Sequence, residues 1–302
     1  MELVYRVQKE DDGQRAVDLL TARTGMSRLC CKRVRLYGTL LCNDQAHRMI
    51  DPVHTGDLLV ARYSPNGQPV PGIRPVAGVR IRYRDDWILA VTKPAGLVTH
   101  PRHLQDKDAL TALLADRPLH PVGRLDRDTS GLVLIALNGH AHHVISRHPQ
   151  TKQYLALVHG RFPAPTGLIF APIRRAKHSI ILRETCSDGP AARSLWQERR
   201  YYPAFDVSLV SLRLLTGRTH QLRLHCQACG CPIVGDSLYD GNRPPDRLDR
   251  TINRQALHAA ALCFRHPVSG AATHVTAPLP DDFRQLLRIV RTHQPESLTS
   301  GR

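Results

Sequence analysis

Residues 121–137 read Pro-Val-Gly-Arg-Leu-Asp-Arg-Asp-Thr-Ser-Gly-Leu-Val-Leu-Ile-Ala-Leu. The second part, 132–137, is an apolar run of the length expected for a buried strand. The part before it is a loop with two carboxylates, two guanidinium groups and two hydroxyls. Asp126 lies between Arg124 and Arg127, and nearby cations favour the ionised carboxylate. An ionised carboxylate at the start of a strand can act as nucleophile or base, although such a loop can also be a solvated turn bonded to its own backbone.

The composition indicates a protein that binds a polyanion. Lys plus Arg number 42 against 26 Asp plus Glu, which gives the 302-residue chain a formal charge of +16. A protein with so positive a net charge usually binds nucleic acid. An anionic membrane surface is the alternative, but no stretch resembles the basic amphipathic helix that would favour it. No apolar run has the length of a transmembrane helix, and the N-terminus lacks the apolar core of a signal peptide. We therefore expect a cytoplasmic protein that acts as a monomer on RNA and has no membrane partner.

The eight cysteines fit a reducing compartment, where thiols stay free. Three of them, Cys226, Cys229 and Cys231, form a tight cluster beside His225. A zinc site normally needs a second pair of ligands at a fixed spacing, and the sequence contains none. We therefore expect a structural role for this cluster and no metal.

The chain divides into four predicted parts: an RNA-binding module at 1–63, a Pro/Gly-rich linker at 64–78, a catalytic domain at 79–291 and a disordered tail at 292–302. The linker carries four prolines and three glycines, which exclude a helix or a central strand. The tail is short and polar.

Residues 1–63 are predicted to form two helices followed by short strands. The first helix is expected over 16–22, and Ser27 is a favourable N-cap for a second helix that ends near Gly38. Short strands are expected over 39–42 and 57–61. This order of elements resembles the alpha-L RNA-binding motif.

Three cations share one face of the second helix. Arg28, Lys32 and Arg35 stand at positions i, i+4 and i+7, which lie above one another on a helix. Such a face suits contacts with phosphates, although a charged helix face is more often simply solvated.

The catalytic domain alternates predicted strands and helices. Strands are expected at 79–83, 87–92, 132–137, 152–159 and 205–215, and helices after Asp108, around 141–145 and from 219 or 220 to 230.

Several motifs stand in order along this domain: KPAGLVTHP at 93–101, GRLDRDTSG at 123–131, KQYLALVHG at 152–160, TGRTHQLRLH at 216–225, PIVGDSLY at 232–239, and LHA with HPVSG at 257–259 and 266–270. Their sequence and order resemble the RluA-type pseudouridine synthases. One departure is Gly123, which stands where these synthases usually carry histidine. The resemblance implies an α+β fold with a mixed, largely antiparallel sheet flanked by helices.

The resemblance also implies the reaction and its residues. Uridine becomes pseudouridine when its carbon–nitrogen glycosidic bond breaks, the base turns, and carbon 5 joins the sugar, with no cofactor or metal. Asp126 takes the place of the catalytic carboxylate, which either attacks the sugar or removes a sugar proton. Tyr154 takes the place of the residue that stacks on the base, and Arg218 of the arginine that pairs with the carboxylate. Side chains expected to bind phosphates are Arg124, Arg127, Lys152 and Arg223.

Two other functions fit parts of the pattern. One is an RNA-binding ribosome-assembly factor that has lost catalysis, against which the set Asp126, Tyr154 and Arg218 argues. The other is a glycosidase built on Asp126 and Asp128. Its two carboxylates need a defined separation, which residues two apart on one loop do not obviously provide.

Overall fold

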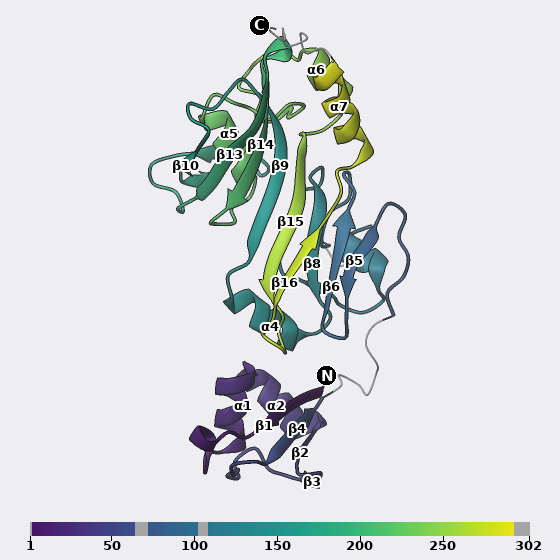
Figure 1. Cartoon of the computed structure of the whole chain (residues 1–302), viewed down its shortest axis with the longest axis vertical. Coiled ribbons are helices and arrows are strands. Elements are labelled where there is room, and N and C mark those ends of the chain that lie inside the picture. Colours follow the sequence, from purple (N-terminus) through teal and green to yellow (C-terminus); the bar gives the residue numbers. More distant parts are fainter. Residues whose placement is uncertain (1, 64–71, 102–107, 293–302) are drawn as a thin grey trace, which may run out of the picture.

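The computed structural model describes residues 2–63, 72–101 and 108–292 (Figure 1). In these residues the strands form a four-stranded sheet, a ten-stranded sheet and a two-stranded hairpin. The four-stranded sheet and its helices come from the first 63 residues, and the ten-stranded sheet comes from the catalytic domain. No helix in the described part of the chain is long and apolar enough to cross a membrane.

The N-terminal sheet has the strand order β1-β4-β2-β3 and packs against two helices. Its elements are β1 (Glu2–Arg6), η1 (Lys9–Asp11), α1 (Ala16–Thr24), α2 (Arg28–Tyr37), β2 (Thr39–Cys42), β3 (Gln45–Ala46) and β4 (Leu58–Arg62). Both predicted helices and both predicted strands are confirmed. Ser27 is the N-cap of α2, because its hydroxyl accepts a hydrogen bond from the Cys30 N–H at 3.1 Å. The strand β1, which pairs with β4 along its whole length, was not predicted.

The large sheet is mixed and largely antiparallel, as predicted. Its order is β10-β13-β14-β9-β15-β8-β6-β5, with β16 beside β15 and β7 beside β8. Its strands are β5 (Arg80–Arg84), β6 (Ile88–Lys93), β7 (His120–Pro121), β8 (Ser130–Ala136), β9 (Thr151–His159), β10 (Thr166–Phe170), β13 (Arg193–Tyr202), β14 (Val207–Leu214), β15 (Leu257–Arg265) and β16 (Ala272–Thr276). The remaining elements are α3 (Leu110–Leu114), α4 (Gly139–Arg147), β11 (Ile173–Arg175), β12 (Arg183–Thr185), η3 (Pro203–Phe205), α5 (Gln221–Ala228), α6 (Arg247–Thr251) and α7 (Asp281–Thr292).

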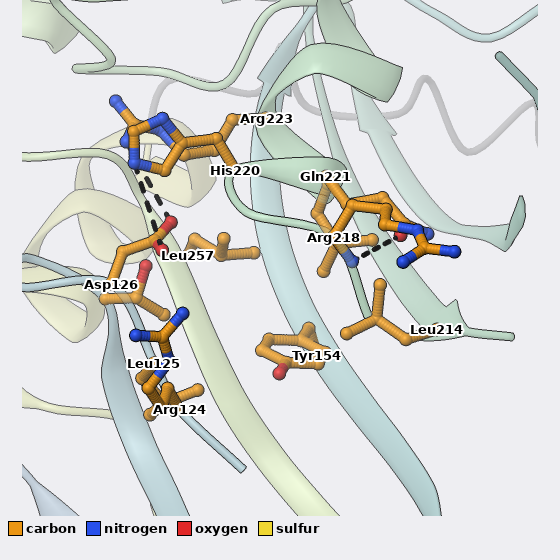
Figure 2. A pocket seen from close by; sticks show the side chains of 12 residues that line it. Arg124, Leu125, Asp126, Tyr154, Leu214, Arg218, His220, Gln221, Arg223 and Leu257 are labelled. Atoms are coloured by element: carbon orange, nitrogen blue, oxygen red, sulfur yellow. Dashed lines mark hydrogen bonds and ion pairs between the residues drawn. The ribbon is translucent and has the colours of Figure 1, made fainter. Parts of the chain in front are cut away.

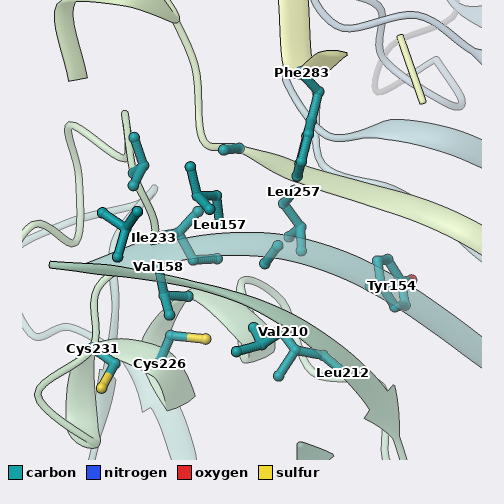
Figure 3. Packing of buried hydrophobic residues seen from close by; sticks show 14 of the residues in the cluster. Tyr154, Leu157, Val158, Val210, Leu212, Cys226, Cys231, Ile233, Leu257 and Phe283 are labelled. Atoms are coloured by element: carbon teal, nitrogen blue, oxygen red, sulfur yellow. The ribbon is translucent and has the colours of Figure 1, made fainter. Parts of the chain in front are cut away.

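Two long strands at the centre, β9 and β15, connect the two halves of the sheet (Figure 1). Apolar side chains from β9, β14 and α5 pack into one cluster beside them (Figure 3). Cys226 and Cys231 belong to this cluster, and the ring nitrogens of the neighbouring His225 lie at hydrogen-bond distance from Ser194 and from the Ala171 carbonyl. The cysteine cluster therefore contributes to the core.

The first half of the predicted linker, 64–71, lies outside the described residues. The second half, 72–78, packs on the catalytic domain instead of crossing solvent. The Arg74 N–H donates to the Leu114 carbonyl at 2.8 Å, and the Arg74 guanidinium pairs with Asp116 at 2.7 Å. These bonds attach the second half of the linker to α3 and the turn after it.

Two further differences from the predictions concern the helices α3 and α7. The N-cap of α3 is Ala109 and not the predicted Asp108. The helix α7, which ends at Thr292 and buries Phe283, Leu286 and Leu287, was not predicted. Residues 293–302 of the predicted tail lie outside the described residues.

Because two histidines are buried, we predict that the free energy of unfolding decreases as the pH falls. Burial lowers the pKa of both His140 and His258 to about 4, from an ordinary value of 6.5. Below pH 6.5 the unfolded chain therefore binds protons that the folded chain does not, so the free energy of unfolding falls until the pH nears 4. The expected loss is roughly 1 kcal/mol per histidine between pH 7 and pH 5.5. Urea unfolding at several pH values measures it. The His140→Phe variant should show a smaller pH slope, and an unchanged slope would contradict the assignment.

Candidate active site

A pocket opens where the loop before β8 meets β9, the end of β14, the start of β15 and the start of α5 (Figure 2). Its lining combines a few apolar side chains with several charged and polar ones. These residues are Arg124, Leu125, Asp126, Thr129, Tyr154, Leu214, Arg218, His220, Gln221, Leu222, Arg223 and Leu257. The pocket therefore joins segments that are more than one hundred residues apart in the sequence.

The loop that carries Asp126 is held in place from two sides. On one side, the Thr99 hydroxyl donates to the Leu125 carbonyl at 3.1 Å and accepts from the Leu125 N–H at 3.2 Å. On the other side, the Arg254 guanidinium donates to the Asp128 carbonyl at 3.3 Å, and the Gln255 amide donates to the Thr129 hydroxyl at 3.0 Å. Such support fixes the backbone from which a catalytic side chain projects.

Lys93, at the end of β6, also holds this loop in place. Its side chain is 1% exposed, and its ammonium donates to the carbonyl oxygens of Pro94, Leu97 and Arg127 at 2.7–2.9 Å. Burial lowers the pKa of Lys93 to about 7, while the nearby carboxylates Asp128 and Asp126 act in the opposite direction. Three carbonyl acceptors use all three N–H bonds of an ammonium group, so the geometry fits the charged form.

The start of β8 requires a glycine. Gly131 has a φ of +118°, and a Cβ there would overlap the backbone of Ala259 on β15. The two strands run parallel at this point, with Gly131 opposite Ala259. The close approach brings the Asp126 loop beside the start of β15, which supplies Leu257 to the pocket.

The carboxylate of Asp126 faces a different arginine from the one predicted. Its Oδ2 lies 3.9 Å from Nη1 of Arg223, a residue of α5 with a 6% exposed side chain. The Arg223 guanidinium is fixed by two further hydrogen bonds, from Nε and Nη2 to Asp236 at 2.7 and 2.6 Å. It also lies over the ring of Tyr239, with 4.9 Å from Cζ to the ring centroid. Arg223 was predicted to bind phosphate, but it is buried and committed to carboxylates.

Arg218 lines the pocket but is directed elsewhere (Figure 2). Its Nε donates to the Ala191 carbonyl at 3.1 Å, and its backbone N–H donates to the Gln221 side chain at 2.9 Å. Both Arg218 and Asp126 are described, and no ion pair joins them. The structure thus does not show the predicted pairing between these two described residues: Arg218 precedes α5, whereas Arg223 lies within the helix and faces the loop.

Tyr154 on β9 lines the pocket together with Asp126 (Figure 2). The side chain is buried among the apolar cluster of the core and is 4% exposed. Burial raises its pKa well above the ordinary value, and the charge of Asp126 acts in the same direction. The phenol is therefore protonated at neutral pH, and its ring is a neutral part of the pocket wall.

His220, which was not among the predicted site residues, is the N-cap of α5 and has a left-handed conformation with φ of +57°. Such a conformation is uncommon for a residue other than glycine and is found at sites that need a particular geometry. The Tyr239 hydroxyl accepts from the Arg183 N–H at 2.9 Å and lies 2.8 Å from His220 Nδ1. The other ring nitrogen of His220, Nε2, lies 4.0 Å from Asp126 Oδ1. The sequence GRTHQ does not indicate that His220 adopts a positive φ.

The sequence pattern of the RNA pseudouridylate synthase family matches residues 87–228, which include Asp126, Tyr154 and Arg223. An uncharacterized RNA pseudouridine synthase of Chloroflexus aurantiacus is 37% identical over 287 residues, covering 89% of this chain and 87% of the relative. The chain belongs to the RluA-type RNA pseudouridine synthase family. The ribosomal large subunit pseudouridine synthase C of Escherichia coli strain K12 is 34% identical over 284 residues, covering 89% of this chain and 86% of that one.

A solved structure supports the same fold for this RNA pseudouridine synthase. The human RNA pseudouridylate synthase domain containing 1 has a TM-score of 0.54 and 26% identity, and the match covers 74% of this chain and 99% of the human one. The synthase is accordingly an RNA-modifying isomerase.

Gly123, which stands where these synthases usually carry histidine, lies beside Lys152 on β9. A Cβ at Gly123 would overlap the Nζ atom of Lys152. Lys152 was predicted to bind phosphate, but its ammonium occupies the space that a side chain at 123 would fill. Burial also lowers the pKa of Lys152.

The remaining predicted phosphate ligands lie at the surface. Arg124 lines the pocket and makes no ion pair with any described residue. Arg127 is exposed and donates from Nε to the Gly96 carbonyl at 3.2 Å. The face of α2 formed by Arg28, Lys32 and Arg35 is exposed to solvent.

Proposed function

We propose that this synthase converts specific uridines of ribosomal RNA into pseudouridine, with Asp126 as the catalytic carboxylate. The observation that carries the proposal is the position of Asp126. It lines a pocket together with Tyr154 and lies 3.9 Å from the fixed guanidinium of Arg223. The proposal places the reaction in the cytoplasm.

The reaction needs an ionised carboxylate near carbon 1′ of the sugar. The bond between carbon 1′ and N1 of uracil breaks, a bond between carbon 1′ and carbon 5 forms, carbon 5 loses a proton and N1 gains one. Atoms and electrons balance without a further reactant. Asp126 can attack carbon 1′ or remove the proton on carbon 2′, and both routes need its charged form. The Arg223 guanidinium, 3.9 Å from Asp126, can orient this carboxylate.

Tyr154 is proposed to stack on the uracil after the nucleotide has left its helix. Enzymes that act on a base take it out of the stack and hold it against aromatic side chains. A phenol that stays protonated fits stacking better than proton removal, because a neutral phenol is a weak base.

The preference for ribosomal RNA rests on the relatives and on charge. One relative is named for the ribosomal large subunit. The formal charge of +16 and the exposed cations of the N-terminal module suit a long, folded polyanion. We propose that residues 1–63, as an alpha-L-type module, contribute to this binding.

The test is a map of pseudouridine in total RNA from cells with and without the gene. We expect at least one ribosomal uridine to lose its modification in the deletion strain and to regain it with the wild-type gene. A ribosomal map that stays unchanged, with loss confined to transfer RNA, would overturn the proposed substrate. No change in any RNA would favour the non-catalytic assembly factor.

A further inference from the structure

His220 lines the Asp126 pocket, and none of the steps assigned to Asp126, Arg223 and Tyr154 uses it. Its side chain is 12% exposed, and its Nε2 lies 4.0 Å from Asp126 Oδ1 (Figure 2). This separation is too long for a hydrogen bond. It leaves room for a reacting atom about 3 Å from both groups, which is the arrangement expected of two catalytic side chains.

The ring of His220 is fixed on its other side by Tyr239. Nδ1 lies 2.8 Å from the Tyr239 hydroxyl, and the two rings meet edge to face with their centroids 5.5 Å apart. A hydroxyl oxygen has two lone pairs. The Tyr239 oxygen can therefore accept both from the Arg183 N–H, at 2.9 Å, and from a proton on His220 Nδ1. In this tautomer Nε2, the nitrogen nearer Asp126, carries no proton and has a free lone pair.

The backbone of His220 has an uncommon conformation for its residue type. Among the described residues, five other than glycine have a positive φ, and four of them are asparagine or aspartate, which adopt it most readily. His220 is the exception in this set, with φ of +57°. Such conformations cluster at active sites. The backbone is thus a second feature, independent of the distance to Asp126, that is typical of a functional side chain.

The charged groups that face His220 lie on several elements. Asp126 belongs to the loop before β8, Arg223 to α5, Asp236 to the segment after α5, and Arg183 to β12. Burial lowers the pKa of His220, as do Arg223 and Arg183, whereas Asp126 and Asp236 act in the opposite direction. The net direction is downward, so the imidazole is uncharged at neutral pH and able to accept a proton.

The reaction contains a proton transfer that Tyr154 does not account for, since its phenol stays protonated. Once carbon 5 is joined to carbon 1′, the bond between carbon 5 and its hydrogen must break. The electrons of that bond form the double bond between carbons 5 and 6, and those of the double bond between carbon 6 and N1 move to N1, which takes a proton. Asp126 is a carboxylate again at this stage on either route.

We propose that His220 is the base that removes the proton from carbon 5, through Nε2. The inference rests on the proposed function. Carbon 5 is then bonded to carbon 1′, the atom at which Asp126 acts, so its proton lies close to a carboxylate that is 4.0 Å from Nε2. Imidazole is a stronger base than a carboxylate, and the imidazolium that forms is stabilised by the charge of Asp126. His220 then gives its proton to water, and N1 takes one from water.

The test compares two transcripts of large-subunit ribosomal RNA that differ only at carbon 5 of their uracils, one with uridine and one with 5-fluorouridine. Fluorine cannot leave carbon 5 as a cation, so the second substrate reaches the carbon-linked base without the step assigned to His220. The variants are His220→Asn, since asparagine tolerates a left-handed backbone, and His220→Gly, which leaves space for free imidazole. Thermal unfolding checks the fold of each variant. Mass spectrometry of the digested RNA gives the single-turnover rates.

We expect both variants to form pseudouridine about 10²–10⁴-fold more slowly than wild type, the order of a lost general base, and to convert 5-fluorouridine within about threefold of wild type. Imidazole in solution should raise the rate of His220→Gly with uridine about tenfold or more. Equal losses with the two substrates would assign His220 to an earlier step and overturn the proposal. Wild-type pseudouridine formation by both variants would overturn it as well.

The same substrates test the proposed function separately. Asp126→Asn should fail with both RNAs, because Asp126 acts before carbon 5 is joined to the sugar. If wild-type protein converts both RNAs and Asp126→Asn converts neither, while the His220 variants keep the wild-type rate with uridine, the role of His220 is refuted and the proposed function stands.

Discussion

The Asp126→Asn variant is expected to lose pseudouridine formation by about 10⁴-fold or more, which is the order seen when a catalytic nucleophile is removed. An amide neither attacks a sugar nor accepts its proton at neutral pH, whereas the shape of the side chain is kept. RNA affinity should change little, because it comes from many cations. Release of tritium from RNA labelled at uracil carbon 5 measures the chemistry, and filter binding measures the affinity.

Asp128→Asn provides a matched control. It removes the same charge from the same loop, but Asp128 is exposed and does not line the pocket. Its activity should stay within about threefold of wild type, because its charge reaches the site only through solvent. Asp126→Asn activity within tenfold of wild type would refute the assignment. Equal, severe losses in both variants would instead favour a mechanism with two carboxylates.

Substitution of Arg223 is expected to have the second largest effect, with about 10²-fold or greater loss of the single-turnover rate in Arg223→Lys. The planar guanidinium contacts Asp236 through two nitrogens and faces Asp126 with the third. A lysine supplies the charge but not the fork. Arg223→Met should lose as much activity and also destabilise the fold by about 3–5 kcal/mol, because Asp236 becomes a buried, unpaired charge.

A double variant separates these two effects. Arg223→Met combined with Asp236→Asn removes both buried charges, so urea unfolding should show recovered stability while the rate stays low. Arg218→Ala is the comparison, and its rate should fall less than about tenfold because Arg218 bonds to the Ala191 carbonyl. A larger loss for Arg218→Ala than for Arg223→Lys would support the pairing that was first predicted.

The sequence could predict the elements whose signal is local. The apolar run before Asn138, the Ser27 cap and the alternating strands all appear in the structure within a few residues. The helix α7 was also predictable, because Phe283, Leu286, Leu287 and Val290 recur at helical spacing.

The arrangement of the site was harder to predict because it depends on distant pairings. Two arginines of one motif, Arg218 and Arg223, have the same chemistry, and the folded chain places Arg223, on α5, beside Asp126. Leu257 enters the pocket through the parallel pairing of β15 with β8, which no local pattern reveals.

The contact between Gly123 and Lys152 constrains how this sequence can evolve. Any side chain at 123 would have to displace the Lys152 ammonium. A mutation to the histidine usual in relatives would therefore require the flexible Lys152 side chain to adopt another rotamer. We expect the two positions to be coupled in evolution, so that a lineage with histidine at 123 has also moved or lost the lysine.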